Sequence, residues 1–102
     1  MKPSTHRPTQ AIIDLTAIQA NIKNFKRYTG DRTEIWAVVK ANGYGHGAND
    51  VAQSANDLVS GFCVSNLDEA IELRSHGIVK PILVLSGIVP EDIHIAVNLR
   101  VT

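Results

Sequence analysis

The segment Ala37–Gly47 (AVVKANGYGHG) holds the side chains of this sequence that are best suited to covalent chemistry. Lys40 follows an apolar run and precedes three glycines and Tyr44. The carboxyl ends of buried parallel strands are where α/β folds place reactive groups. A lysine amine attacks an aldehyde only as the free base, which a low-dielectric position favours. The pattern therefore predicts a Schiff-base lysine at Lys40, with a glycine turn able to approach a ligand and a phenol at Tyr44 able to reach a phosphate oxygen.

Plainer interpretations of the same residues exist. Without the glycine-rich motif that follows it, Lys40 would mark the point where a strand meets solvent, since lysines are mostly exposed. Tyr44 could be a packing aromatic with a backbone partner, and His46 is best explained as a structural histidine. Neither a Walker phosphate loop nor a dinucleotide fingerprint is present in the sequence.

Other reactive residue types lack the partners that chemistry would need. Cys63 cannot form an internal disulfide, and its apolar neighbours predict a buried, inert thiol. His6, His76 and His94 have no partner at ligand spacing, so no metal site is predicted. The acidic residues near Arg74 are expected on a solvated helix face, where capping and the helix dipole explain them: Asp68, Glu69 and Glu72.

Hydrophobic periodicity predicts alternating strands and helices around this segment. Asn66 and Glu69 form a capping-box pattern that opens one helix, and Gly77 is expected to end it. Pro90 and the acids after it are typical of the first turn of another. The expected strands are Ala11–Leu15, Glu34–Val39, Gly61–Ser65 and Pro81–Leu85, with a further strand beginning at Arg100; the expected helices run from a Thr16 cap to Gly30, over Val51–Val59, from Asn66 towards Gly77, and from Pro90.

This alternation predicts an α/β fold on a parallel sheet, either a barrel or an open doubly wound sheet. An eight-unit barrel takes ~250 residues, whereas 102 residues supply about three βα units. A natural domain seldom stops on an unpaired edge strand. We therefore expect residues 1–102 to be the amino-terminal part of a larger α/β barrel domain.

Composition narrows the range of partners. Ten basic and ten acidic residues give a formal net charge of zero, which favours neither nucleic acid nor an acidic membrane surface. No apolar run approaches the ~18 residues of a membrane span, and the polar start is unlike a signal peptide. The expected compartment is the cytoplasm.

The segment Ala37–Gly47 resembles the attachment motif for pyridoxal 5′-phosphate (PLP) in alanine racemases. Family-like pieces flank it in the same order, so the resemblance spans nearly the whole chain: Arg7–Thr9, Ile13–Leu15, Asn66–Ala70 and Pro81–Leu85. The sequence departs from the family at Gln10 and Ile12, where an aromatic and an acid are frequent, and at Asn42, where Asp is frequent.

This resemblance implies a fold-type III PLP enzyme, with a parallel (β/α)8 TIM-type barrel followed by a β-rich domain, that works as a homodimer. Lys40 would hold PLP as a Schiff base and then serve the D-alanine proton, while a tyrosine of the other subunit serves the opposite face of the α-carbon. Tyr44 would bind the cofactor phosphate, and Val38 and Leu85 would line the ring. The implied reaction interconverts L-alanine and D-alanine and so supplies D-alanine for peptidoglycan. Because the second base and the later barrel strands are missing from these residues, the chain alone is expected to be inactive.

Three alternatives remain open on the sequence, two of which bind PLP. One is another fold-type III enzyme, such as a racemase of broader specificity or a decarboxylase, which pocket residues beyond Thr102 would distinguish. The other is a non-catalytic PLP-binding protein, although those relatives usually lack the glycine-rich segment after the lysine. A structural module in which Lys40 has no ligand would show no cofactor absorbance.

Overall fold

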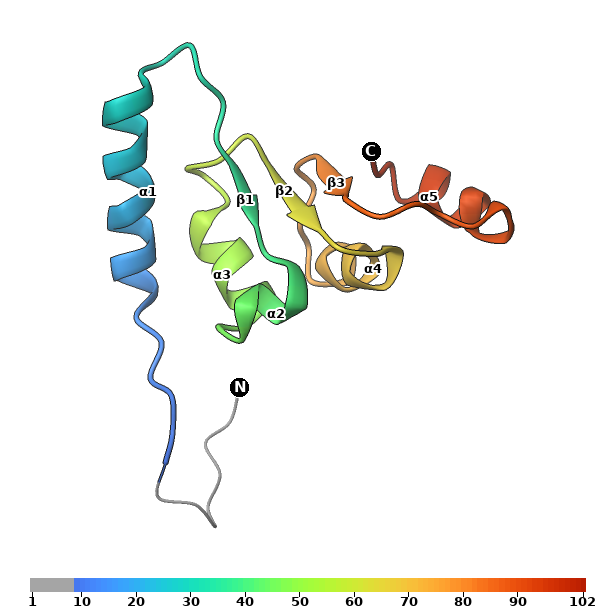
Figure 1. Cartoon of the computed structure of the whole chain (residues 1–102), viewed down its shortest axis with the longest axis horizontal. Helices are drawn as coiled ribbons and strands as arrows, with labels where there is room; N and C mark the ends of the chain where they lie inside the picture. Colours follow the sequence, from blue (N-terminus) through green and yellow to red (C-terminus); the bar gives the residue numbers. More distant parts are fainter. Residues whose placement is uncertain (1–8) are drawn as a thin grey trace.

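A computed structural model describes residues 9–102 of the chain (Figure 1). Strands and helices alternate along these residues, as the periodicity predicts. His6 and the start of the Arg7–Thr9 segment lie outside the described residues. The elements are α1 (Leu15–Thr29), β1 (Trp36–Val38), α2 (Lys40–Tyr44), α3 (Ala48–Ala55), β2 (Gly61–Val64), α4 (Leu67–Ser75), β3 (Ile82–Val84), the 3-10 turn η1 (Pro90–Asp92) and α5 (Ile93–Asn98).

The three strands form one parallel sheet in the order β1-β2-β3. Register aligns Val38 of β1 with Cys63 of β2, and Cys63 with Leu83 of β3. All three carboxyl ends therefore lie at the same end of the sheet, and the loop after each strand leaves from there. The predicted α/β class with a parallel sheet is confirmed.

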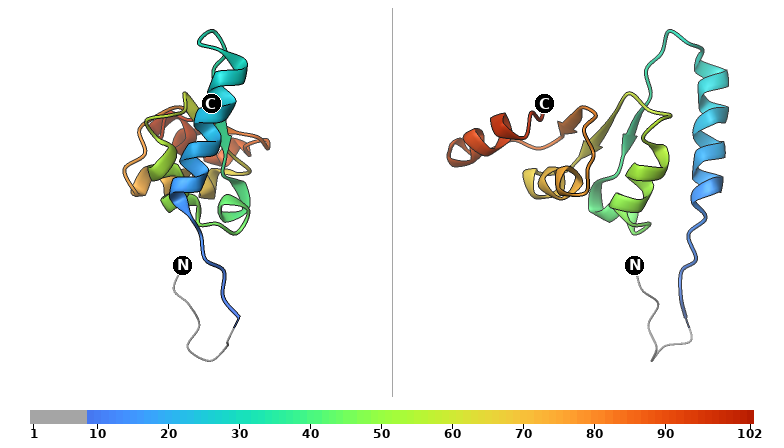
Figure 2. Two further views of the ribbon diagram at one scale, coloured as in Figure 1. Left: turned by 90° about the vertical axis from the view of Figure 1, so that its left-hand side faces the viewer. Right: turned by 180° about the vertical axis from the view of Figure 1, so that it is seen from behind.

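Helices α3 and α4 cover one face of this sheet and form the core with it. Phe62, Val64 and Ile82 point into that core and are fully buried. Alternation along a strand sends the neighbouring residues to the other face, and Val38 there is 41% exposed. The views in Figures 1 and 2 agree that α1 lies at one end of the molecule, next to α3, and α5 at the other.

The strand predicted at Ala11–Leu15 is wrong, because residues 11–14 are irregular and Leu15 begins α1. Among the described residues no strand runs beside this segment to complete a hydrogen-bond ladder. Asp14, rather than Thr16, caps the helix: its Oδ1 accepts a hydrogen bond from the Ala17 amide at 3.1 Å. The apolar residues before Asp14 therefore lead into α1 and do not form a strand.

The predicted limits of β2, α4 and β3 are close to the observed ones, whereas the helix predicted over Val51–Val59 is α3 at Ala48–Ala55 and ends before Leu58. Asn66 caps α4, and Gly77, with φ +90, follows its end. Beyond α5, the Thr102 amide donates to Ile82 O at 2.8 Å and Thr102 O accepts from the Val84 amide at 2.8 Å. Thr102 thus lies beside β3 as a parallel neighbour. The strand does not begin at Arg100 as expected, because Arg100 has φ 53° and belongs to the turn after α5.

Candidate active site

Lys40 directly follows β1, and the backbone on its amino side is well fixed. The Val39 amide donates to Cys63 O at 2.9 Å and extends the ladder between β1 and β2 by one residue. The Val39 side chain is 1% exposed, whereas Lys40 itself is half-buried. The lysine therefore stands where the buried strand reaches the rim of the sheet, as the sequence predicts.

The residues after Lys40 form the turn that the glycines predict, and its backbone is left-handed. Ala41, Asn42 and Tyr44 have φ of 51°, 55° and 57°, and Gly43 has φ of 64°. Each non-glycine residue in this region costs about 1–2 kcal/mol. The Gly43 amide donates to Val39 O at 2.8 Å and holds the turn against the end of β1.

Asn42 and Gly43 join this turn to the start of α3. Asn42 Oδ1 accepts a hydrogen bond from the Ala48 amide at 2.9 Å, and Asn42 O accepts from the Gly47 amide at 2.9 Å. A Cβ on Gly43 would lie 3.3 Å from the Ala48 nitrogen. The glycine is thus needed both for its left-handed conformation and for this close approach.

Glu69 is the residue of this site that the sequence did not reveal. Asn66 Oδ1 accepts from the Glu69 amide at 3.0 Å, as a capping box requires. The Glu69 carboxylate does not return to the Asn66 amide. It accepts from the Ser65 amide at 2.6 Å and from the Ala41 amide at 2.8 Å. The expectation that Glu69 merely faces solvent is therefore wrong, because its carboxylate joins β2 to the residue after Lys40.

Arg74 is also not on a solvated face. Its Nη1 donates to Ile78 O and to Lys80 O, each at 2.8 Å, and its Nε donates to Leu99 O at 2.9 Å. Burial, and secondarily the charge of Arg100, lowers the pKa of the Arg74 guanidinium from its ordinary value. The guanidinium thus donates the hydrogen bonds that water would otherwise donate to carbonyl groups after α4 and just after α5.

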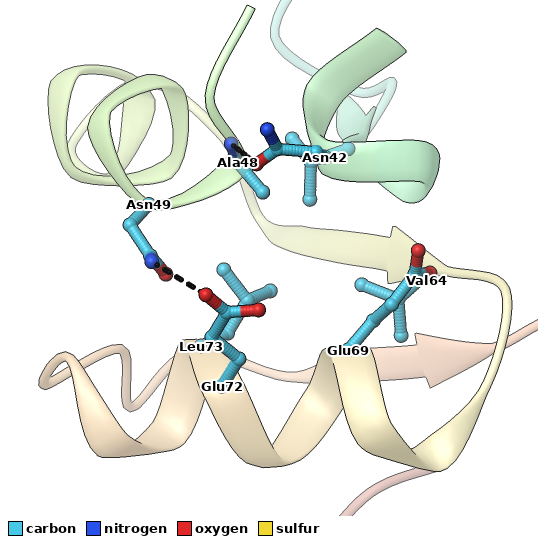
Figure 3. Close-up of a pocket in the computed structure, with 8 residues that line it drawn as sticks. Asn42, Ala48, Asn49, Val64, Glu69, Glu72 and Leu73 are labelled. Carbon is cyan, nitrogen blue, oxygen red and sulfur yellow. Dashed lines mark hydrogen bonds between the residues drawn. The ribbon is translucent and has the colours of Figure 1, made fainter. Parts of the chain in front are cut away.

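A cavity of about 310 Å³ lies beneath the turn, on the side of the helices (Figure 3). Asn49 Nδ2 donates to Glu72 Oε1 across it at 3.3 Å, and Asn49 Oδ1 is buried without a partner in the described structure. None of the four side chains predicted to bind the cofactor lines it. Its walls come from α2, α3, α4 and the strand ends: Val39, Asn42, Ala48, Asn49, Val64, Glu69, Glu72 and Leu73.

The four predicted site residues lie at or just beyond the carboxyl ends of the two outer strands, Val38, Lys40 and Tyr44 on the side of β1 and Leu85 on that of β3. Tyr44 is 60% exposed and Leu85 is 52% exposed. Leu85 continues β3 beside β2, because its amide donates to Val64 O at 2.8 Å. Val38 and Leu85 therefore border the same edge from the two outer strands, and Lys40 with Tyr44 lies in the turn above the first of them.

The other reactive residues stay outside this arrangement. Cys63 is buried in β2, and burial raises the pKa of its thiol, in keeping with the inert thiol predicted. Over residues 9–102, no three side chains of the metal-binding types lie close enough together to hold an ion. No helix in that same range is long and apolar enough to cross a membrane.

Comparison with known proteins identifies the family. The family model for the N-terminal domain of alanine racemase matches residues 13–102. The chain belongs to the alanine racemase family. An alanine racemase of Lactococcus lactis subsp. cremoris is 60% identical over 102 residues, and one of Streptococcus agalactiae is 53% identical over the same length. Both matches cover 100% of this chain.

Solved racemase structures share the fold of this chain. The crystal structure of alanine racemase from E. faecalis matches 99% of the chain with a TM-score of 0.90 at 42% identity. The enzyme from Bacillus anthracis with bound L-Ala-P matches 87% with a TM-score of 0.84, also at 42% identity. The chain spans 28% of the length of the curated racemases and of the E. faecalis chain.

Proposed function

We propose that this chain supplies the PLP-attachment region of an enzyme that interconverts L-alanine and D-alanine, with Lys40 as the attachment residue. The observation that carries the proposal is the placement of Lys40, at the carboxyl end of a parallel strand and directly before a left-handed turn that hydrogen bonds hold to that strand. Membership of the alanine racemase family over residues 13–102 supports it.

The residues around Lys40 suit an aldehyde cofactor with a phosphate and an aromatic ring. No hydrogen bond occupies the Lys40 amine within the described part of the chain. Val38 and Leu85 offer exposed apolar surface at the same edge, which ring contact would remove from water. The Tyr44 hydroxyl can donate to a phosphate oxygen. These four residues would hold PLP by its aldehyde, its ring and its phosphate.

The residues of the chain then perform orientation and proton transfer. PLP, when bound, supplies an electron sink for the electron pair left on the substrate α-carbon. Lys40 Nζ would remove or return the proton on one face of that carbon, which serves D-alanine. The fixed turn sets the direction from which the amine approaches, and that orientation is a large part of the rate. The opposite face requires a second base from another part of the enzyme.

The remaining parts of the proposal rest on the family resemblance. Residues 1–102 would form the amino-terminal part of the PLP-binding barrel, and the substrate carboxylate and the second base would be served by residues outside them. The working enzyme would be a cytoplasmic homodimer that takes small-molecule alanine as its substrate. We expect no racemisation of alanine by the 102 residues alone.

Cofactor attachment tests the proposal directly. The purified chain is mixed with PLP, its absorbance is recorded, and the product is reduced with borohydride and mapped by mass spectrometry. We expect a visible-range band that disappears on reduction, with label on Lys40, and neither in Lys40→Ala. Absence of the band, or label spread over many lysines in wild type and variant alike, would contradict the assignment of Lys40. If a longer protein that includes these residues carried the label at Lys40 but did not turn over alanine, a non-catalytic PLP-binding protein would be favoured.

A further inference from the structure

The peptide groups on both sides of Lys40 are held by hydrogen bonds from different parts of the fold. On the amino side, Val39 O accepts from the Gly43 amide at 2.8 Å. On the carboxyl side, the Ala41 amide donates to Glu69 Oε2 at 2.8 Å. The two peptide planes determine the direction in which the Cα–Cβ bond of Lys40 leaves the backbone. Of these two bonds, the one to Glu69 is made by a side chain, 28 residues further along the sequence.

A helix cap does not need this contact. In a capping box, the acid in the first turn of the helix returns to the amide of its own cap residue. Glu69 instead places one oxygen on the Ser65 amide at the end of β2 and the other on Ala41 in the turn. Both bonds have an ionised acceptor, a type roughly twice as strong as neutral pairs. The carboxylate therefore ties together the ends of two neighbouring strands.

The turn has a reason to require such a tie. Ala41 is held at φ 51° and has no glycine-like freedom. If the Ala41 amide lost its acceptor, the residue could relax towards the right-handed or extended region and rotate the Lys40–Ala41 peptide with it. The amine of Lys40 would then sample several directions.

We propose that Glu69 is the positioning residue of Lys40, its carboxylate clamping the peptide after Lys40 onto the end of β2. The inference rests on the proposed function for the role of Lys40, but the clamp itself is a property of the backbone. Glu69 acts through Ala41 and Ser65 and touches no reacting atom.

Glu69→Gln tests the clamp, because a carboxamide has the same shape but only one oxygen. Its NH2 group would face one of the two backbone amides, donor against donor. Glu72→Gln is the matched control: it removes the same charge from the same helix, and over residues 9–102 the carboxylate of Glu72 accepts only from Asn49 Nδ2, at 3.3 Å.

Two readouts separate the clamp from the function. The first is hydrogen exchange of the Ala41 and Ser65 amides, which needs no cofactor. We expect exchange at one or both to become roughly tenfold faster in Glu69→Gln and to stay unchanged in Glu72→Gln. The second is the rate at which PLP attaches to Lys40, expected to fall about tenfold in Glu69→Gln and to change less than about twofold in Glu72→Gln.

Three outcomes would overturn the inference. In Glu69→Gln, the exchange rates of both amides could equal those of the wild type, or the rate of PLP attachment could equal that of the wild type. The third is that Glu69→Gln and Glu72→Gln change these rates by equal factors. If the wild type takes up no PLP at Lys40, the proposed function fails while the exchange measurement still decides the clamp. If Glu69→Gln does not fold, Glu69→Asp replaces it. That side chain keeps the charge but is one methylene too short to reach both amides, so wild-type exchange and attachment in it would equally overturn the clamp.

Discussion

The turn after Lys40 contains strain that its neighbours must offset. Three residues other than glycine have positive φ in this turn: Ala41, Asn42 and Tyr44. At about 1–2 kcal/mol each, they cost several kcal/mol in total. The hydrogen bonds that Asn42 accepts from the Ala48 amide and Glu69 accepts from the Ala41 amide offset part of that cost. Strain of this kind persists only where surrounding contacts over-determine the backbone, and it is common at functional sites.

Gly43→Ala should destabilise the chain and loosen this turn. A side chain at φ 64° is strained, and its Cβ would press against the Ala48 nitrogen at 3.3 Å and the Ala48 Cα at 3.4 Å. We expect the free energy of unfolding in urea to fall by about 1–2 kcal/mol. Gly87→Ala is the control, because its Cβ would meet no atom within 4 Å and its φ is not left-handed. Equal stability of the two variants would contradict the account of the turn.

Residue types and local spacing were enough to predict that Lys40 follows the end of a buried strand, but not that Glu69 contacts the next residue. Lys40 and Tyr44 belong to one continuous motif, so their proximity follows from the chain itself. The contact of Glu69 with Ala41 depends on the arrangement of β1, β2 and the start of α4, which no local pattern contains. The capping-box pattern did mark Glu69, but a local explanation of it was complete without the turn.

At the scale of elements, Arg74 joins parts of the chain that secondary structure alone leaves separate. Two carbonyl groups of the segment between α4 and β3, and the carbonyl of Leu99 just after α5, accept hydrogen bonds from its guanidinium. Its planar array of donors can satisfy several acceptors at once, which an ammonium cannot do in the same geometry. Thr102, which pairs with β3, follows directly after the part of α5 that Arg74 holds.

Arg74→Lys should therefore cost far more than a conservative exchange on the surface. We expect the free energy of unfolding to fall by about 2 kcal/mol, because hydrogen bonds from the charged group to buried carbonyls are lost. Hydrogen exchange at Thr102 should rise with it. The control is Arg27→Lys in the exposed last turn of α1, expected to change stability by less than about 0.5 kcal/mol. If Arg74→Lys were as mild as this control, the carbonyl contacts would contribute little.

The sequence predicts a helix or strand well where residues within it set its limits, and poorly where its formation depends on a partner strand elsewhere in the chain. Helix α4 carries its own cap in Asn66 and its own stop in Gly77, so its limits follow from sequence. The Ala11–Leu15 segment has the composition of a strand, but a strand also needs a partner for its backbone groups. No partner lies beside it in residues 9–102, and Asp14 directs the chain into α1.

The molecule as a whole is flat, and helices α3 and α4 cover one face of its sheet. Its extents are 44 × 42 × 21 Å, and its Cα radius of gyration is 15.0 Å, against about 13 Å for a compact domain of 100 residues. The core lies between the sheet and helices α3 and α4, while α1 packs on α3 at one end. No side chain of α1 is fully buried, and Phe25 and Tyr28 are 65% and 92% exposed. The alternation of elements predicts the sheet, but not which helices remain at its margin.

This arrangement predicts that α1 opens before the rest of the chain. Its one hydrogen bond to another element among residues 9–102 runs from Gln19 Nε2 to Ser54 O at 2.7 Å, whereas all four residues of β2 are buried. Amides of α1 should therefore exchange at least roughly tenfold faster than those of β2, because regions with few buried contacts open with a lower free energy. Gln19→Ala should widen the difference, while Asn21→Ala on the exposed side should leave it unchanged. A common exchange rate for α1 and β2 would mean that the chain opens as a single unit, with α1 contributing fully to the core.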